Sequence, residues 1–356
     1  MRRFQFFLLF SFILSNQPSL SQEILDGKLL YEEEAGCTSC HGNDGKGEAE
    51  GVTLDPPPPD FTDCSFNSRE PRRDWQAVIK HGGGARGLSE SMPAYGEALS
   101  DAQIDAIIDY LKIFCDEPNW PPGELNFRRA QITAKAFPEN EALLIPTYSH
   151  HQQSAAAAKF VYARRIGRLA QWEIAVPFER ERGVASATGF GNIELSAKHV
   201  FWHNLKSRAI FSGGMETSLP TRKSFVGIGA SEWKIAPYLA AGKAAGAWSV
   251  QSNIKYETPL QNVKGGRELF YNLAFTWALT PEKKGFFPMV ELNGARNLDT
   301  REKTLFLTPQ LYIGLVKRGH IAFSFGGQIP AAGDKPFDYR LVSFLLWEYA
   351  DGGLWW

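Results

Sequence analysis

The stretch Cys37-Thr38-Ser39-Cys40-His41 decides the fold of the N-terminal part of this chain. Two cysteines separated by two residues and followed directly by a histidine form the C-x-x-C-H pattern, which is the attachment signature of a c-type haem. The two thiols can add to the vinyl groups of one porphyrin, and the adjacent imidazole can bind the iron as its proximal ligand. We therefore expect one haem c, held covalently by Cys37 and Cys40, with His41 on the iron.

Two other chemistries use a C-x-x-C pair. A thioredoxin-like dithiol does not need a histidine at the following position and belongs in a βαβ context. A zinc site would need a second pair of ligands downstream, and the sequence offers no such pair. Haem attachment is the interpretation that uses all three side chains.

Covalent attachment of haem normally takes place outside the cytoplasm, and the start of the chain agrees with export. Met1-Arg2-Arg3 is basic, residues 4–14 are apolar, and small residues follow before Gln22. This pattern predicts a secretory signal peptide over residues 1–21. The apolar run is too short for a membrane helix, and no later window holds about 18 uninterrupted apolar residues.

The distribution of cysteines divides the chain. All four cysteines lie between Cys37 and Cys115, and a chain of 356 residues is long enough for two domains. We expect a haem domain over 22–115, a connector over 116–139 and a second domain over 140–356. Lys plus Arg number 38 and Asp plus Glu number 39, so the charge balance predicts no nucleic-acid partner.

The haem domain is predicted to be all-α. A helix should lead into Cys37, and a second should cover 72–80. Ser100 with Gln103 three residues later forms a capping box, and apolar residues at helical spacing then continue a helix to near Cys115. The run Pro56–Pro59 must form an extended loop.

Met92 is the candidate for the distal iron ligand. It is the only methionine of the haem domain, and Pro93 stiffens the loop that would present its sulfur. The alternatives are His81, which three glycines follow, and an open distal site. Met92 could also be a core residue that fills a gap.

Cys64 and Cys115 are the two remaining thiols. In an exported protein such a pair usually forms a disulfide, although two buried free thiols are the alternative. Closing a loop of this length would remove chain entropy worth about 4 kcal/mol in the simple model. We expect a structural disulfide between Cys64 and Cys115.

The segment from Gly27 to Cys115 resembles the class I cytochrome c family. The residues that carry the resemblance are C-T-S-C-H-G-N-D-G-K-G, then S-M-P-A-Y-G-E-A-L-S, then the C-terminal amphipathic helix. The resemblance implies that Met92 is the distal ligand and that the Gly27/Tyr31 helix packs against the last helix. It also implies that a carbonyl of the Pro56–Pro59 loop accepts the proton of His41 Nδ1.

Beyond the connector, apolar and polar residues alternate with a period of two, as in Leu269, Tyr271, Leu273, Phe275 and Trp277. About ten residues are what a tilted membrane-spanning strand needs, whereas strands of soluble domains usually have five or six. About twelve such stretches occur, near 141–149, 157–166, 169–178, 191–202, 207–217, 225–240, 246–257, 268–279, 286–293, 303–316, 320–328 and 338–350.

The connections between these stretches are short at one end and longer and polar at the other, which is the layout of an outer-membrane barrel. We therefore predict an all-β, antiparallel transmembrane barrel of about twelve strands in contact with outer-membrane lipid. An even strand count brings both ends of this domain to the periplasmic side, where the haem domain must lie. The alternative is a soluble β-sandwich or solenoid.

The second domain resembles the outer-membrane transporters of the phenol-degradation meta-pathway family. The resemblance rests on Gly189-Phe190-Gly191-Asn192-Ile193 and on Glu216-Thr217-Ser218-Leu219-Pro220-Thr221, although Asn192 stands where an Asp is more usual. The combination of the two halves is similar to the fused cytochrome–porins of iron-oxidising bacteria. The connector is rich in proline, and such segments behave as semi-rigid spacers that would suit a haem held near the barrel mouth.

Two functions are open at this point. A haem with His and Met ligands has no free coordination position, which predicts an electron carrier and no catalytic residues. The haem domain is too wide for a twelve-stranded lumen, so either its haem edge enters the barrel mouth or a periplasmic or extracellular redox partner completes the path. The alternative function is a channel for small solutes whose cytochrome serves a periplasmic redox partner.

Overall fold

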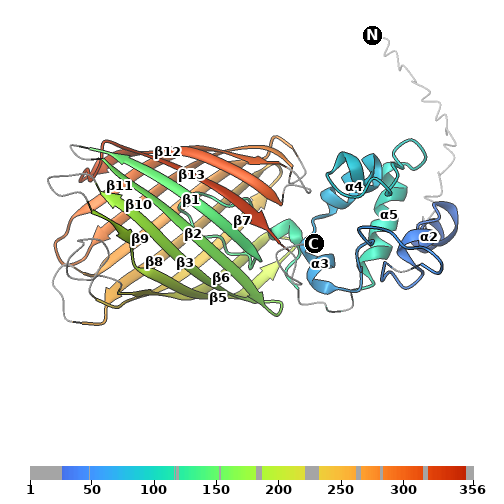
Figure 1. Cartoon of the computed structure of the whole chain (residues 1–356), viewed down its shortest axis with the longest axis horizontal. Coiled ribbons are helices and arrows are strands. Elements are labelled where there is room, and N and C mark those ends of the chain that lie inside the picture. The colour runs from blue at the N-terminus through green and yellow to red at the C-terminus, as the bar shows by residue number, and fades with distance from the viewer. Residues whose placement is uncertain are drawn as a thin grey trace, which may run out of the picture.

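The computed structural model describes residues 26–47, 49–115, 117, 120–151, 154–181, 187–220, 232–261, 266–280, 284–315 and 320–349. The expected signal peptide lies outside the described residues. A small helical domain is followed by a long barrel of strands, and the two lie end to end (Figure 1). We call the barrel end that carries the helical domain the near end and the opposite one the far end. None of the described helices is long and apolar enough to cross a membrane.

Short helices build the helical domain around an apolar core. They are α1 (Gly27–Leu29), which continues into the π-helical turn η1 (Leu30–Glu34), then α2 (Thr38–His41), α3 (Cys64–Arg69), α4 (Arg72–Ala85) and α5 (Asp101–Lys112). The core consists of Leu30, Tyr31, Phe61, Trp75, Ile79, Ile104, Ile107, Ile108 and Leu111. The all-α prediction for this domain is confirmed.

The predicted C-terminal helix of the domain is also present. Ser100 and Gln103 form the capping box of α5. A Cβ at Gly27 would collide with the backbone carbonyl of Ala106, so α1 packs directly on α5. The disulfide between Cys64 and Cys115 is formed and ties α3 to the end of α5. The short helix α3 and the continuation of α4 beyond residue 80 were not expected from the sequence.

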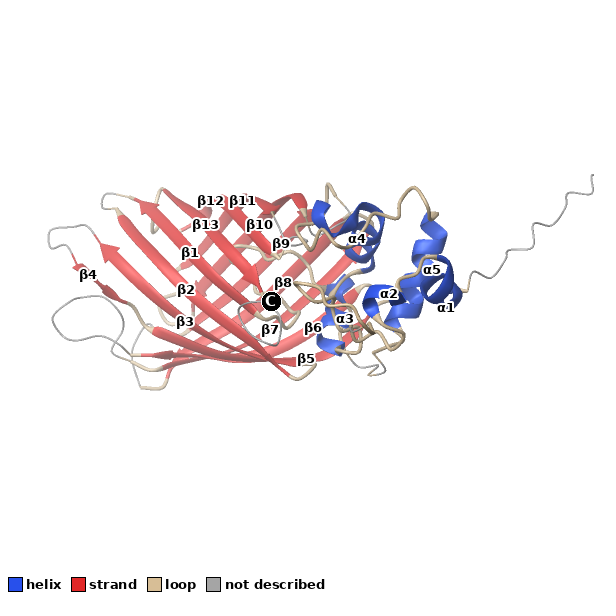
Figure 2. Ribbon diagram, turned by 45° about the vertical axis from the view of Figure 1, so that its right-hand side comes forward, coloured by secondary structure: helices blue, strands red, loops and turns tan. Residues whose placement is uncertain are grey.

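The second domain is a closed antiparallel barrel, as Figure 2 shows. The strands are β1 (Glu141–His150), β2 (Ala155–Ile166), β3 (Ala170–Glu181), β4 (Ala187–Phe190), β5 (Ile193–Asn204), β6 (Ala209–Leu219), β7 (Lys234–Ala245), β8 (Trp248–Pro259), β9 (Glu268–Trp277), β10 (Gly285–Asn297), β11 (Lys303–Gly314), β12 (Ile321–Gly333) and β13 (Tyr339–Glu348). Among the described residues β4 and β5 both pair with β3 and share one position, which gives twelve positions. The sheet closes because β1 pairs with β13.

The predicted stretches correspond to β1–β3 and β5–β13, but β4 was not predicted, and β10 and β12 run four and five residues past their predicted ends, to Asn297 and Gly333. The strand β7 also differs. The expected stretch 225–240 begins in residues that lie outside the described ones, and the strand continues to Ala245. The predicted end of this stretch at residue 240 therefore lies five residues too early. A run of small residues gave too weak an alternation to place this strand end from the sequence.

The outer surface of the barrel is apolar. In β13, Leu341 and Leu345 are 53% and 49% exposed, whereas Val342, Phe344 and Leu346 are at most 3% exposed. Aromatic side chains gather at both ends, with Trp248 and Trp277 stacked at the near end and Phe178 against Phe190 at the far end. An apolar band between aromatic girdles is what a bilayer requires of a spanning barrel.

The connector does not stand between the two domains. Its residues 125–140, which we call the plug, lie inside the near half of the barrel. Phe127 and Phe137 are buried in one cluster with Val200 of β5 and Ile210 of β6. The expectation of a spacer is wrong, because a twelve-stranded lumen is wider than its own side chains fill and this segment occupies the space.

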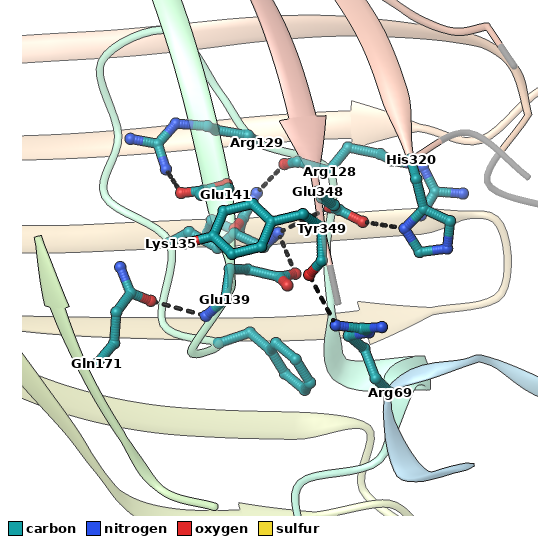
Figure 3. A network of polar contacts seen from close by, with 12 residues as sticks. Arg69, Arg128, Arg129, Lys135, Glu139, Glu141, Gln171, His320, Glu348 and Tyr349 are labelled. Atoms are coloured by element: carbon teal, nitrogen blue, oxygen red, sulfur yellow. Dashed lines mark hydrogen bonds and ion pairs between the residues drawn. The ribbon is translucent and has the colours of Figure 1, made fainter. Parts of the chain in front are cut away.

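Charged side chains fasten the helical domain to the near end, in what we call the docking contact (Figure 3). His320 lies between Glu70 of the helical domain, at 2.9 Å from its Nε2, and Glu348 of β13, at 3.0 Å from its Nδ1. Arg69 Nη1 donates to the backbone carbonyl of Tyr349 at 3.1 Å. All these side chains are buried. The contact joins residues 280 positions apart in the chain.

Replacing His320 with Ala should loosen the helical domain, because the buried carboxylates of Glu70 and Glu348 would lose the imidazole between them. Leaving a buried polar group without its hydrogen-bond partner costs about 1–3 kcal/mol. We expect limited proteolysis in detergent to release the helical domain several-fold faster than from wild type. The control is His151→Ala, because the contact of His151 with Asp338 is exposed and should contribute little. Equal release from both variants would show that the docking contact does not fasten the domain.

Candidate haem site

A cavity of about 710 Å³ lies inside the helical domain. Its wall is formed by α2, the loop Pro56–Pro59, α4, the loop that carries Met92, and α5. Most of this wall is apolar, with Phe61, Trp75, Ile79, Leu99, Ile107 and Leu111 among its members. All lining residues belong to the segment between Tyr31 and Leu111.

The C-x-x-C-H residues lie together on this cavity. Cys37, Cys40 and His41 all line it, and neither cysteine takes part in the disulfide. One helical turn brings the three side chains together, because His41 N donates to Cys37 O at 3.0 Å. The His41 ring stacks on Phe61 with ring centroids 5.0 Å apart. Two thiols and an imidazole therefore meet at one apolar space.

Burial favours the uncharged forms of His41 and Cys37. It lowers the pKa of His41 to about 4, so the imidazole retains the lone pair that an iron ligand needs. Burial also raises the pKa of Cys37 to about 11. His41 Nδ1 is buried without a hydrogen-bond partner in the described part of the chain, so the expected bond to a carbonyl of Pro56–Pro59 is not formed. An apolar cavity with this donor set fits a haem.

Met92 lines the same cavity, and the glycine run after His81 explains its place. Gly83 N donates to Met92 O at 3.0 Å. A Cβ at Gly83 would collide with the carbonyl of Ser89, and Gly82 has a φ of +79° that favours glycine. The glycines thus let the Met92 loop lie on the end of α4. His81 itself is exposed and is not among the lining residues, which favours Met92 as the distal ligand.

Lys112 connects the haem cavity to the docking contact, and the sequence did not reveal it. Its Nζ lies 4.5 Å from the ring centroid of Trp75, a cavity residue, and donates to the carbonyl of Glu70 at 3.1 Å. Burial lowers the pKa of Lys112 to about 8. In the sequence it looks like an ordinary basic residue in the last turn of a helix, since nothing there places Glu70 beside it.

With the geometry of both halves described, their families can be given. Residues 143–337, more than half of the chain, match the family described as putative MetA-pathway of phenol degradation. The chain belongs to this family. Residues 22–111 match the family described as cytochrome C oxidase, cbb3-type, subunit III, so the helical domain is a c-type cytochrome domain, which implies haem binding. No curated protein matches the chain.

Solved structures resemble the barrel part. An outer membrane channel from Pseudomonas putida F1 is 13% identical over 63% of this chain and 100% of that channel, with a TM-score of 0.49. The KdgM porin is 9% identical over 59% of this chain and 99% of its own, with a TM-score of 0.42. The NanC porin is 10% identical over 58% of this chain and 99% of its own, also with a TM-score of 0.42.

Replacing Met92 with Ala should let added cyanide or imidazole bind the ferric protein. It should also lower the reduction potential by on the order of 100 mV, because a thioether ligand favours Fe(II). Absorbance titration and redox titration measure the two effects. His81→Ala, the matched control, should change neither quantity. The reverse pattern would assign the distal position to His81.

Proposed function

We propose that this chain is an electron-transfer protein of the outer membrane, in which one covalently attached haem c is held at the end of a barrel. The observation that supports the proposal most directly is the single cavity lined by Cys37, Cys40, His41 and Met92. Bound there, a haem would supply an Fe(II)/Fe(III) couple that exchanges one electron at a time.

Different residues of the cavity would hold different parts of the haem. Cys37 and Cys40 would fix it through thioethers, while His41 and Met92 would bind its iron. An iron held by two protein ligands in this way would have no place for a substrate, so we propose an electron carrier and not an enzyme. The apolar wall, with Phe61 and Trp75, would keep water from the haem, which is one means of setting its potential.

The docking contact supports a fixed position for the cytochrome domain. Arg69 and Glu70 bind Tyr349 and His320 at the near end, so the domain does not hang on a free tether. Of the two routes considered from the sequence, entry of the haem edge into the barrel mouth finds no support, because the cavity is lined by the cytochrome domain alone. We therefore propose that a periplasmic or extracellular redox partner completes the path.

The barrel supports the proposed location. Its apolar outer band suits the outer membrane, and the predicted signal peptide would export the chain. At the near end the strands are joined by short turns, such as the one between β7 and β8, whereas the connection from β6 to β7 at the far end is long. Because short turns are periplasmic in such barrels, we propose that the cytochrome domain lies in the periplasm.

A solute channel is the second candidate function, and one observation favours it. The far half of the barrel contains a cavity of about 420 Å³, which we call the outer cup. Lys159, Glu194, Lys234 and Glu257 are among its lining residues, so it could receive a small polar solute from the far end. The plug occupies the near half, however, which makes through-passage the less supported role.

Haem attachment should depend on both thiols. Cys37→Ser or Cys40→Ser alone removes one thioether. In the double variant, with both cysteines replaced, the haem should be fully extractable with acidified acetone. Wild-type protein should retain its haem in the same extraction, and absorbance of the two phases measures the partition. Cys64→Ser is a control that removes a cysteine of the disulfide without removing a thioether. Free extraction of haem from wild type would contradict covalent attachment.

The location can be tested independently of the haem. The chain should fractionate with outer membranes and should migrate faster on mild-detergent gels before heating than after it, because a closed barrel resists detergent. Immunoblots of separated membranes measure this. Recovery in the soluble periplasm without detergent would contradict the membrane barrel, while leaving the cytochrome assignment intact.

A further inference from the structure

One ammonium group lies beside the wall of the haem cavity. Lys112 is the basic residue in the last turn of α5, and its Nζ lies over the ring of Trp75, 4.5 Å from the ring centroid. Trp75 lines the cavity, and so does Leu111, the residue before Lys112. The face of an indole ring attracts a cation. The amino group of Lys112 is therefore held close to the place where the haem would lie.

Main-chain carbonyls fix the ammonium in this position. Lys112 Nζ donates to the carbonyl of Asn67 and, at 3.1 Å, to the carbonyl of Glu70. The Glu70 carbonyl also accepts Trp75 Nε1 at 3.2 Å, so one oxygen binds both the ring and the ammonium that lies over it. The carboxylate of Glu70 contacts His320 of the barrel at 2.9 Å. The position of Lys112 thus depends on the docking contact as well as on α5.

Lys112 differs from most cations of the helical domain in the kind of group that binds it. Within the described part of the chain its polar contacts are the two carbonyls, and it forms no salt bridge. Carboxylates offset other cations of the domain in the pairs Lys28–Glu32, Lys46–Asp44, Arg69–Glu70, Arg72–Asp105, Arg72–Asp109, Lys80–Asp101 and Arg86–Asp74. A carbonyl stabilises an ammonium without cancelling its charge. Lys112 therefore brings a net positive charge to the cavity wall.

This charge can be lost at moderately alkaline pH. Burial lowers the pKa of Lys112 to about 8, whereas the carboxylates of Glu124 and Glu70 act to raise it and Arg72 acts to lower it. Glu124 lies in η2 (Gly123–Leu125) of the connector, so the charges that face Lys112 come from the connector as well as from the helical domain. The side chain is only partly buried, and its proton can reach water.

We propose that Lys112 sets the reduction potential of the haem site and couples electron transfer to the release of a proton. The inference rests on the proposed function, because it needs a haem in the cavity. A positive charge at the cavity wall disfavours the additional charge that the site gains when Fe(II) becomes Fe(III). On oxidation one electron would pass to the redox partner, and a fraction of one proton would pass from Lys112 Nζ to water, leaving a neutral amine.

The two effects are one coupling seen from two sides. Charge on Lys112 favours the reduced site by the same factor by which oxidation of the site weakens the binding of the Lys112 proton. The alternative is a purely structural role, since a basic residue in the last turn stabilises a helix through its carbonyls and its macrodipole. That role predicts an effect on stability and none on the pH dependence of the potential.

Redox titration of the full-length, haem-loaded chain at about pH 6 and about pH 9 tests the proposal. The wild-type potential should fall as the pH rises, because Lys112 loses its charge. For Lys112→Met we expect the equilibrium constant for reduction at the lower pH to be smaller by on the order of 10-fold, from the Coulomb energy at an effective dielectric constant of about 20. Its potential should also depend much less on pH.

Two further variants separate charge from structure. Lys112→Arg keeps a positive charge that does not titrate, so its potential should stay high at both pH values. It also covers the case in which Lys112→Met does not fold. Lys28→Met is the matched control, because it removes the same charge from a side chain that is 61% exposed and paired with Glu32. The control should behave as wild type.

Proton release is the second measurement. Oxidation of the reduced protein by ferricyanide near pH 8, in weak buffer with a pH indicator, should release protons from wild type and fewer from Lys112→Arg. The absorbance spectrum must show the same iron ligands in every variant at both pH values. Equal potentials and equal proton release in wild type and both Lys112 variants would overturn the inference while leaving electron transfer intact. A wild-type chain without a haem spectrum would contradict the proposed function, and the inference with it.

Discussion

The polar inner wall of the barrel is the constraint on which the rest of the structure depends. A closed ring of twelve strand positions leaves a lumen that side chains alone do not fill, and every inward polar group then needs water or protein as a partner. Here the partner is the chain itself. The carboxylate of Glu291 binds backbone amides of the connector, and Lys198 binds its carbonyls. A segment whose composition suggests a spacer thus becomes part of the barrel interior.

The position of the cytochrome domain follows from this arrangement. Once the plug is inside, its N-terminal side must leave the lumen at the near end, where Gly123 packs so closely on the Arg69 carbonyl that a Cβ would collide with it. Glu124 then accepts the backbone N–H of Arg72 at the start of α4, at 2.9 Å. The same surface carries Glu70, which binds His320. The covalent connection between the domains and the docking contact therefore both lie at the near end of the barrel.

Short sequence motifs and the regular alternation of apolar and polar residues were enough to predict much of this molecule. The C-x-x-C-H residues, the Met92 loop and the capping box of α5 are recognisable because each depends on neighbours within a few positions. The strands were predictable because alternation with a period of two is repeated along each of them. The disulfide between Cys64 and Cys115 followed from elimination among four cysteines.

The plug and the docking contact could not be predicted, because their partners are far apart in the chain. Proline content describes the stiffness of the connector but not its surroundings, and Glu291 lies about 160 residues away from the amides that it binds. One feature of the sequence did indicate that the barrel wall needs a partner inside the lumen. A carboxylate in the middle of an inward strand face, as in Met-Val-Glu291-Leu-Asn, demands donors that a water-filled channel or a second segment must supply.

The plug has both ends fixed, and this limits how the segment could ever move. Its C-terminal end continues directly into β1, which is hydrogen-bonded to β2 and β13. Its N-terminal end is held against the cytochrome domain by Gly123 and Glu124, and α3 of that domain is tied to Cys115 by the disulfide. The plug therefore cannot leave the lumen as a free loop. It can withdraw only if the cytochrome domain moves away from the near end, and that movement must break the contact of His320 with Glu70. The position of the plug and the position of the haem site are thus one structural state, held by two sets of buried polar contacts.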